Sequence, residues 1–422
     1  MKLTKFKKKN ITLSALVASL ALASGVVQAK SIAITNATVH TVTNQGVLEQ
    51  ATVILDEGKI THVYTNENTP ESISADEVID ANGRILTPGF IGTMNSLGLV
   101  EVGAVSRTQD GKDKKADITF DPSIAFNPNS TVIPYSRTGG ITSSIIVPNG
   151  GDNMFKGQAF VADLSGHTDS IVKTGSAVLI DLGSQSKGSR VLNLQKLRVE
   201  LEDAQKALAK STDKKDSKAP KRDEKIINKL LAGELPLIAH AERATDLLEL
   251  IKIKNDFGIN IVMAGAAEAV RIAPQLAEAN IPVIVNAISN LPSSFDSLTL
   301  SLDNAAILHK AGVKVLLTIS GDTHNIYQLR FDTGVAVANG LPKDAALAAI
   351  TANVADVFSL DAGRIAIGKK ADVVLWSADP FELSSHVEKM WINGEEVNMR
   401  TRQDALRDRY TAKSDMPRAY TK

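Results

Sequence analysis

The 422-residue sequence contains no cysteine, and this absence excludes several kinds of protein. A chain without cysteine has no disulfide framework, no thiolate metal site and no lipid-modified cysteine. Aromatic residues are also scarce, at 4% of the chain, so the core must be built mainly from Ile, Leu, Val and Ala. This composition is typical of α/β proteins, whose parallel strands are buried on both faces. The sequence also lacks a glycine-rich loop that could cradle phosphate.

A basic surplus, which nucleic-acid binding would require, is missing as well. The first 29 residues hold five lysines and no acidic residue, so the remaining chain carries a net charge near −5. A chain with this charge has no electrostatic footprint for nucleic acid. Apolar residues make up 43% and charged residues 22%, as expected of a soluble globular protein.

The N-terminal segment, residues 1–29, is typical of a secretory signal peptide. Lysines gather before residue 10, an uncharged apolar stretch covers 11–27, and small residues precede Lys30. A single membrane anchor is the alternative, but about 17 apolar residues is the short limit for a span. We therefore expect export with cleavage and no stable membrane anchor. The protein would be periplasmic in a Gram-negative cell and secreted otherwise.

The rest of the chain divides into three segments that differ in predicted secondary structure. Residues 30–87 carry short apolar and alternating runs separated by turn signals, which predict β structure. Between 88 and 362, short apolar runs alternate with helix-like segments, which predicts parallel strands with crossover helices. The runs lie at 90–94, 141–147, 177–182, 237–239, 259–263, 282–285 and 313–319, and the stretch 158–163 supplies another. About eight such units fit a (β/α)8 TIM-type barrel better than an open sheet.

Two further segments complete the predicted organisation. Residues 190–235 interrupt the alternation with charges of both signs, which predicts a solvated helix-loop-helix insertion in the barrel. From 363 to 422 the chain returns to β structure, with Asn393-Gly394 as a hairpin signal. Because neither β segment has enough strands to be stable alone, 30–87 and 363–422 are expected to form one small composite β-sandwich.

Three segments resemble the amidohydrolase superfamily, in particular its imidazolonepropionase-like and dipeptidase-like branch. The first runs from Asp80-Ala-Asn-Gly83 to Thr87-Pro-Gly-Phe-Ile91, and the second is Ala239-His240-Ala241-Glu242. The third and most specific extends from Gly340 through Ala349-Ile-Thr-Ala-Asn to Gly363-Arg-Ile-Ala-Ile-Gly-Lys-Lys-Ala-Asp-Val-Val-Leu375. The resemblance covers nearly the whole chain after the signal. It implies the barrel fold and a metal-dependent hydrolase that acts on a small molecule.

The metal-ligand pattern departs from that family. Members usually carry His-x-His at the end of the first barrel strand, where this sequence has Met94 and Ser96. Neither side chain suits a hydrolytic zinc-type site. A metal-bridging Lys or Glu is not found in 176–183, whose only carboxylate is Asp181, and 260–265 holds no histidine. The resemblance leaves His240, as the fifth-strand ligand, and Asp322, as ligand and general base.

The candidate site residues are therefore His240, Asp322 and His324. Asp322 is the predicted catalytic proton carrier, His240 and His324 are predicted to bind substrate, and all three are predicted ligands of one divalent, zinc-type metal ion. Each also has a structural interpretation, since a rim histidine can bond its own loop and Asp322 can cap a helix. Ser96 as a nucleophile would need an adjacent base. Glu101 and Glu242 near the barrel mouth are expected to be solvated carboxylates.

Two functions fit these observations. The first is hydrolysis of a C–N bond in an amide, cyclic amide or dipeptide, with a metal activating water and Asp322 moving the proton. The second is a non-catalytic, metal-free binding protein that forms a homo-oligomer or pairs with an active paralogue, since a fold alone does not establish activity.

Overall fold

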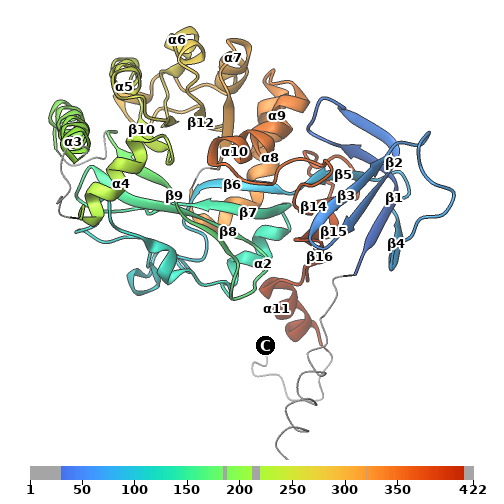
Figure 1. Ribbon diagram of the computed structural model, residues 1–422. Coiled ribbons are helices and arrows are strands. Elements are labelled where there is room, and N and C mark those ends of the chain that lie inside the picture. Colours follow the sequence, from blue (N-terminus) through green and yellow to red (C-terminus); the bar gives the residue numbers. More distant parts are fainter. Residues whose placement is uncertain (1–29, 184–187, 212–218, 320, 413–422) are drawn as a thin grey trace, which may run out of the picture.

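The computed structural model describes residues 30–183, 188–211, 219–319 and 321–412. The predicted signal peptide lies outside the described residues. A barrel-like α/β body and a separate β sheet lie side by side (Figure 1). No helix within the described ranges is both long and apolar enough to cross a membrane.

The separate sheet is made from both ends of the chain. Eight strands follow the order β16-β15-β14-β5-β1-β2-β3, with β4 paired to β1. Strands β5 and β14 join the two ends in antiparallel register, from Pro88 opposite Val373 to Ile85 opposite Trp376. Its strands are β1 (Ile32–His40), β2 (Val47–Asp56), β3 (Lys59–Tyr64), β4 (Glu77–Asp80), β5 (Ile85–Pro88), β14 (Val373–Trp376), β15 (Val387–Ile392) and β16 (Glu395–Glu396).

The second sheet forms the barrel, in the sequential order β6 to β13. The two end strands approach through side chains: the Thr93 hydroxyl donates to the Leu317 carbonyl at 3.3 Å, and the Thr318 hydroxyl donates to the Thr93 carbonyl at 2.8 Å. The barrel is thus nearly closed, and the predicted fold class is confirmed. Its strands are β6 (Phe90–Asn95), β7 (Ile141–Ile146), β8 (Phe155–Asp163), β9 (Ile171–Asp181), β10 (Leu237–Ala241), β11 (Ile261–Gly265), β12 (Val283–Asn286) and β13 (Val315–Thr318).

One strand breaks the expected parallel arrangement. The stretch 158–163 does belong to a barrel strand, but β8 runs antiparallel to both β7 and β9. Short turns at 147–154 and 164–170 connect these strands and leave no room for the crossover helices that parallel neighbours need. The remaining strands, β9 to β13, pair in parallel.

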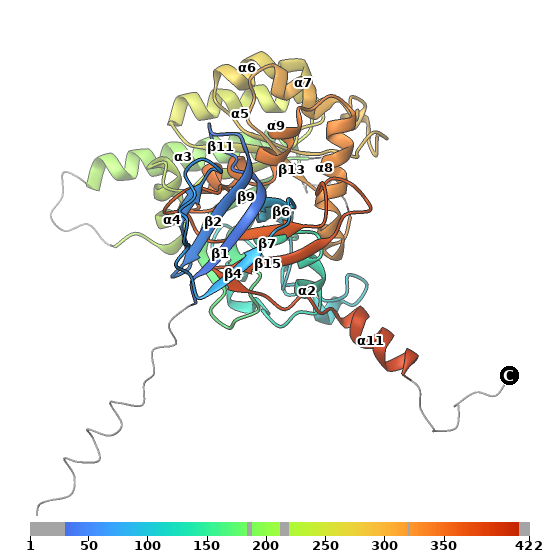
Figure 2. The same ribbon diagram turned by 90° about the vertical axis from the view of Figure 1, so that its right-hand side faces the viewer.

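Helices surround the barrel and also close one end of it (Figures 1 and 2). Helix α10 packs Val354, Ala355 and Phe358 against inward residues of the strands, such as Ile238 and Leu316, so the barrel interior is a packed core. The predicted insertion at 190–235 forms helices α3 and α4. The helices are α2 (Val132–Arg137), α3 (Arg190–Ser211), α4 (Arg222–Leu231), α5 (Ala244–Phe257), α6 (Ala273–Glu278), α7 (Asn304–Lys310), α8 (Leu329–Ala338), α9 (Lys343–Ala349), α10 (Ala352–Phe358) and α11 (Arg402–Thr411).

Two buried arginines tie segments together through backbone carbonyls. Arg330, on α8, donates to the carbonyls of Pro380, Glu382 and Ser385 in the β14–β15 connection at 2.8–2.9 Å. Arg137, on α2, donates to carbonyls of the β8–β9 connection and to that of Asn398. Burial lowers the pKa of Arg330 to about 10, which still leaves it charged at neutral pH. These contacts fix the β sheet against the barrel.

Candidate functional site at the barrel mouth

A layer of polar side chains lies above the apolar barrel core because strand residues two apart share a face. Leu179, Ile238, Ile284 and Leu316 point into the barrel interior. The residues two positions further on are Asp181, His240, Asn286 and Thr318, which therefore face inward at the carboxyl ends of β9, β10, β12 and β13. This is the end of a TIM-type barrel at which ligands bind.

His240 lies between two carboxylates in this layer. Its Nδ1 is 3.2 Å from Asp181 Oδ1, and its Nε2 is 3.4 Å from Glu242 Oε1. Strand register explains the first contact, since His240 and Asp181 are paired residues of adjacent parallel strands. Glu242 Oε2 accepts a hydrogen bond from the Ala267 backbone N–H at 3.0 Å, which fixes the second carboxylate.

The charges of these groups reinforce one another. Burial works to lower the pKa of His240, but the hydrogen bond and charge of Asp181, together with the charge of Glu242, outweigh it and raise that pKa. Burial likewise works to raise the pKa of Asp181, but the contact with His240 and the Gly183 N–H lower it overall. The geometry therefore favours an imidazolium ion between two carboxylates.

Two glycines make room for this arrangement. A Cβ on Gly265 would lie 2.6 Å from Glu242 Oε1 and 2.9 Å from His240 Nε2, and its φ is +76°. A Cβ on Gly183 would lie 3.0 Å from His240 Nδ1. Both ends of the imidazole are thus packed against backbone that tolerates no side chain.

His240 and Glu242 line a cavity of about 280 Å³, which we call the His240 cavity. Its walls combine apolar residues of β11, β12 and α7 with hydroxyl and amide groups from Asn286, Thr318 and the 289–304 loop. The loop is anchored by Asp296, which pairs with Arg190 and lies 3.9 Å from Arg243. A polar floor below mixed walls can bind a small organic molecule.

Asp322 and His324 lie in a neighbouring hollow of about 290 Å³, the Asp322 cleft. Both side chains are exposed, and the cleft is lined mostly by polar residues, which include Glu101 and Lys112. Asp322 precedes the turn at Thr323–Gln328 and makes no side-chain cap hydrogen bond. Of the three predicted site residues, the structure thus brings together Asp322 and His324 but not His240.

Met94 separates the two hollows and lines both of them. Its φ of +52° marks a bulge in β6, where the pairing with β7 shifts register between Gly92 and Asn95. Ser96 is buried, and its hydroxyl donates to the Val147 carbonyl at 3.2 Å. Both residues at the family's usual histidine positions therefore have structural roles here.

The side chains present do not fit the metal that the resemblance implies. Within the described ranges, no group of three His, Asp or Glu residues is arranged to hold a metal ion. His240 has a carboxylate at each ring nitrogen and a raised pKa, whereas a metal ligand must offer a free, neutral nitrogen. The predicted ligand set of His240, Asp322 and His324 is not assembled at one point.

Sequence reasoning missed the carboxylates that surround His240. Glu242 was expected to be solvated, but its side chain is only 18% exposed and contacts the imidazole. Asp181 was identified only as the single carboxylate in 176–183, where a metal-bridging Lys or Glu was expected. The position of Asp181 in the sequence could have revealed this contact. Asp181 ends the apolar run before the one that carries His240, and neighbouring parallel strands end at the same edge of the sheet. Lys156 on β8 is also buried, but its ammonium group donates to the carbonyls of Gly151 and Asn153.

Comparisons with known proteins agree with the geometry of the fold. Residues 223–397 match the model of the amidohydrolase family. A crystal structure of an amidohydrolase from Thermotoga maritima MSB8 is similar at 27% identity, with a TM-score of 0.78 over 87% of this chain and 100% of that one. The amidohydrolase tasK of Hapsidospora irregularis is 22% identical over 389 residues, which are 81% of this chain but only 39% of that protein.

More distant structures share the fold alone. A β-aspartyl dipeptidase from Fervidobacterium islandicum is 16% identical with a TM-score of 0.56, over 88% of this chain and 98% of its own. An adenosine deaminase from Xanthomonas campestris with bound zinc is 15% identical with a TM-score of 0.53, over 90% of this chain and 99% of its own.

Proposed function

We propose that this chain is a small-molecule-binding protein of the amidohydrolase type that works without a metal ion, because residues 223–397 match the model of that family and the fold is similar to that of an amidohydrolase. The observation that carries the proposal is the His240 cavity, whose floor is the His240 imidazole with Asp181 beside Nδ1 and Glu242 beside Nε2. Such a floor offers fixed charges and hydrogen-bonding groups to a ligand but no open metal position.

The ligand would be recognised by the polar groups around that floor. Asn286 and Thr318 project beside His240, and serine hydroxyls come from the 289–297 loop. A cavity of about 280 Å³ is at the lower end of the usual volumes for ligand sites. A dipeptide or a small cyclic amide with its own donors and acceptors fits this size and chemistry.

Hydrolysis of a C–N bond is the second candidate, favoured by the family match and by the charged His240 group at the barrel mouth. If this function is correct, His240 must leave one carboxylate when substrate binds, and an exposed residue such as Asp322 must reach the same molecule. A reduced site with one zinc-type ion would then form only in the complex. The two candidates differ in turnover and in metal content.

The deciding experiment combines binding, turnover and elemental analysis on the purified protein. Dipeptides and cyclic amides are screened by calorimetry, and mixtures with and without added Zn²⁺ or Mn²⁺ are analysed for products by mass spectrometry. We expect ligands that bind without being cleaved, and binding that weakens about tenfold or more in Asn286→Ala, since a lost buried hydrogen bond costs about 1–3 kcal/mol. Cleavage that is lost in His240→Gln, with about one metal per chain, would establish the hydrolase instead.

Export is a separate proposal, because the predicted signal lies outside the described residues. The mature chain would begin at Lys30. N-terminal sequencing of protein from the periplasm or the medium tests this, and an intact Met1 in cytoplasmic protein would refute it.

A further inference from the structure

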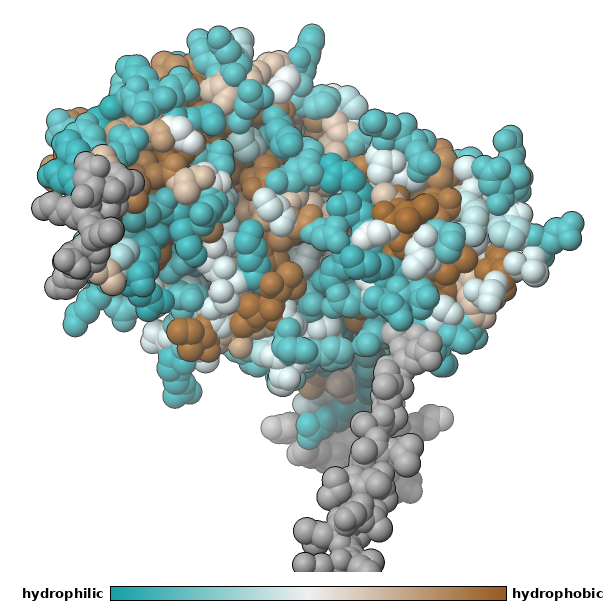
Figure 3. All heavy atoms as spheres, viewed as in Figure 1, coloured by the Kyte–Doolittle hydropathy of each residue, from teal (hydrophilic) through white to brown (hydrophobic). Residues whose placement is uncertain are grey.

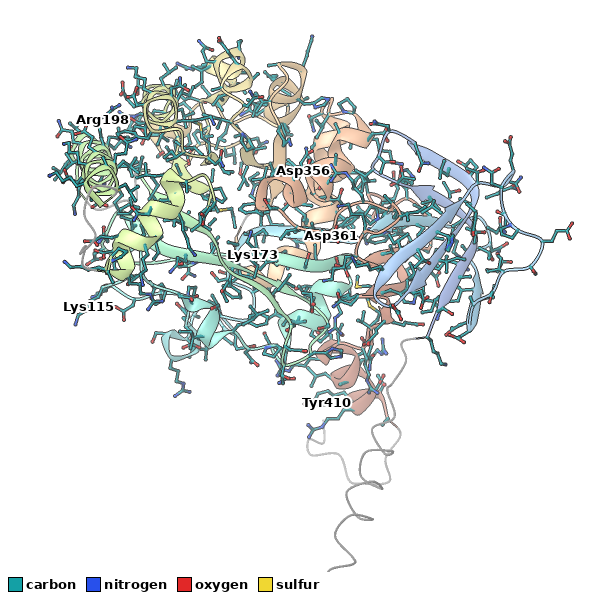
Figure 4. All side chains as sticks on the ribbon, in the orientation of Figure 1. Lys115, Lys173, Arg198, Asp356, Asp361 and Tyr410 are labelled. Carbon is teal, nitrogen blue, oxygen red and sulfur yellow. The ribbon has the colours of Figure 1, made fainter. Side chains whose placement is uncertain are left out.

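Helix α11 stands apart from the rest of the molecule. It projects beyond the body (Figure 2), and none of its residues is buried. Its exposed side chains include Tyr410, 79% exposed and visible away from the barrel in Figure 4, and Leu406, one turn earlier. A capping box between Thr401 and Asp404 starts the helix. A ten-residue helix without tertiary packing is only marginally stable in water, so a partner surface would stabilise it.

The segment around α11 also has a distinct charge. Residues 400–422 contain seven basic and three acidic residues, whereas the chain as a whole is neutral. On the helix, Arg407 pairs with Asp404 and Asp408. Arg402 and Arg409 form no ion pair with any described residue. The surface that receives α11 should therefore be apolar at its centre and acidic at its rim.

One groove of the molecule has that character. It lies between the ends of α3 and α4 and the barrel loops beneath them, and its volume of about 760 Å³ exceeds that of either mouth hollow. Apolar side chains line its floor, including Ile118, Phe155, Ala207 and Ile227. Figure 3 shows that apolar residues on the face viewed there occur in patches among polar ones.

Carboxylates dominate the rim of this α3–α4 groove. Asp117, Glu200, Asp203, Asp223 and Glu224 line it, with Lys210 as a basic residue. Burial, with the charge of Asp223, raises the pKa of Glu200 even though Lys196 opposes the shift. A basic partner would pair with these carboxylates. The groove thus complements α11 in charge.

We propose that α11 of one copy of this chain docks into the α3–α4 groove of a second copy. Within one molecule, α11 lies below the body, whereas α3 and α4 lie at its far side (Figure 1), and α11 buries no residue there. In this contact Leu406 and Tyr410, one helical turn apart, would lie on the apolar floor, and Arg402 and Arg409 would face the acidic rim, which is a helix-in-groove mode of recognition. Because helix and groove are different surfaces, the contact is head-to-tail and produces rings or open chains.

Charge reversal of each surface tests this directly. One variant, Arg402→Glu with Arg409→Glu, reverses the charge of the helix. Another, Asp117→Lys with Asp203→Lys and Asp223→Lys, reverses the charge of the groove. Sedimentation of the full chain should show mass rising with concentration, and less so in high salt because exposed charges are screened. Each variant alone should associate at least tenfold more weakly. Mixed together, the two variants should associate again, because each helix then faces a groove of opposite charge.

A third variant serves as control. Glu67→Lys with Glu71→Lys changes as much charge as the helix variant does, on an exposed loop far from both surfaces, and it should associate like the parent. A parent chain that stays monomeric at every attainable concentration would overturn the proposal. So would self-association that neither charge reversal weakens, or mixing that restores nothing. Binding of a monomeric parent to anionic lipid vesicles through Arg402 and Arg409 would show a membrane surface as the partner instead.

Discussion

The two hollows at the barrel mouth hold their charged side chains in different ways. Around the His240 cavity, parallel strands β9 to β13 bring Asp181 and His240 into register, so the charges satisfy one another below the surface. Around the Asp322 cleft, β6 bulges at Met94, and Asp322 and His324 lie exposed on the loop that follows β13.

This difference shows what regular strand pairing contributes to a site. A side chain at a strand end has its direction fixed by the ladder, so a neighbour can be matched to it. A side chain on a loop several residues beyond the end of a strand has no such constraint. The His240 half should therefore respond strongly to small changes, and the Asp322 half weakly.

The largest effect is expected from Gly265→Ala. The new methyl group would meet Glu242 Oε1 at 2.6 Å while the backbone keeps a φ of +76°, so the unfolding free energy should fall by about 3 kcal/mol. Gly258→Ala is the matched control, since its φ is +69° but nothing lies within 4 Å of the added Cβ. Its cost should be only about 1–2 kcal/mol for the left-handed backbone. Equal losses in urea denaturation would mean that Glu242 and His240 can move aside.

A second prediction concerns Asp332, on α8 behind the Asp322 cleft. Burial raises the pKa of Asp332 from 3.8 to about 6, and no hydrogen bond to its side chain exists within the described ranges. Its contribution to stability is intact below about pH 4 and is lost as the pH rises through about 6. Asp332→Asn should therefore be more stable than the parent by about 2 kcal/mol at pH 8, with no difference at pH 4.

Asp356 provides a control of opposite sign for that experiment. Burial works to raise the pKa of Asp356, but its bonds to Arg364 at 2.8 and 3.0 Å lower it. Asp356→Asn should destabilise the protein at pH 8 and approach the parent in acid. If both variants change stability in the same direction at pH 8, a general charge effect explains them.

A smaller effect is expected from Asp181→Asn. Burial then opposes only the charge of Glu242, so the pKa of the His240 imidazole should fall, observable in a histidine ring NMR titration. The stabilisation from the pair requires Asp181 ionised and His240 protonated. It should be greatest between about pH 4 and 6.5 and decline outside that window. An unchanged pKa would show that Glu242 alone holds the charge.

The smallest effect is expected on the other side of the mouth. Asp322→Ala and His324→Ala should each change the unfolding free energy by less than about 0.5 kcal/mol, because both side chains are exposed. Neither should alter ligand binding in the His240 cavity. A loss above 1 kcal/mol, or a matched loss of binding, would show that the two hollows act as one site.

The sequence was sufficient for the fold but only partly for the site. Apolar runs and helical spacing located all eight barrel strands, and the stretch 363–375 identified the return to the β sheet. Strand direction was not accessible, because an apolar run such as β8 is the same whether it runs parallel or antiparallel. The partners of His240 were missed for a related reason. Strand register places Asp181 beside His240, and the turn after β10 places Glu242 beside the same imidazole. Neither contact can be predicted from composition.

The pairing of β5 with β14 has a consequence for how the chain reaches this structure. Pro88 can pair with Val373 only after the intervening barrel residues have been synthesised. Until then, the edge of β5 that pairs with β14 has no partner. Contacts so distant in sequence slow folding. During that interval the open edge of β5 can pair with another chain. The interval between synthesis of the two ends is therefore the stage at which this protein is most exposed to aggregation.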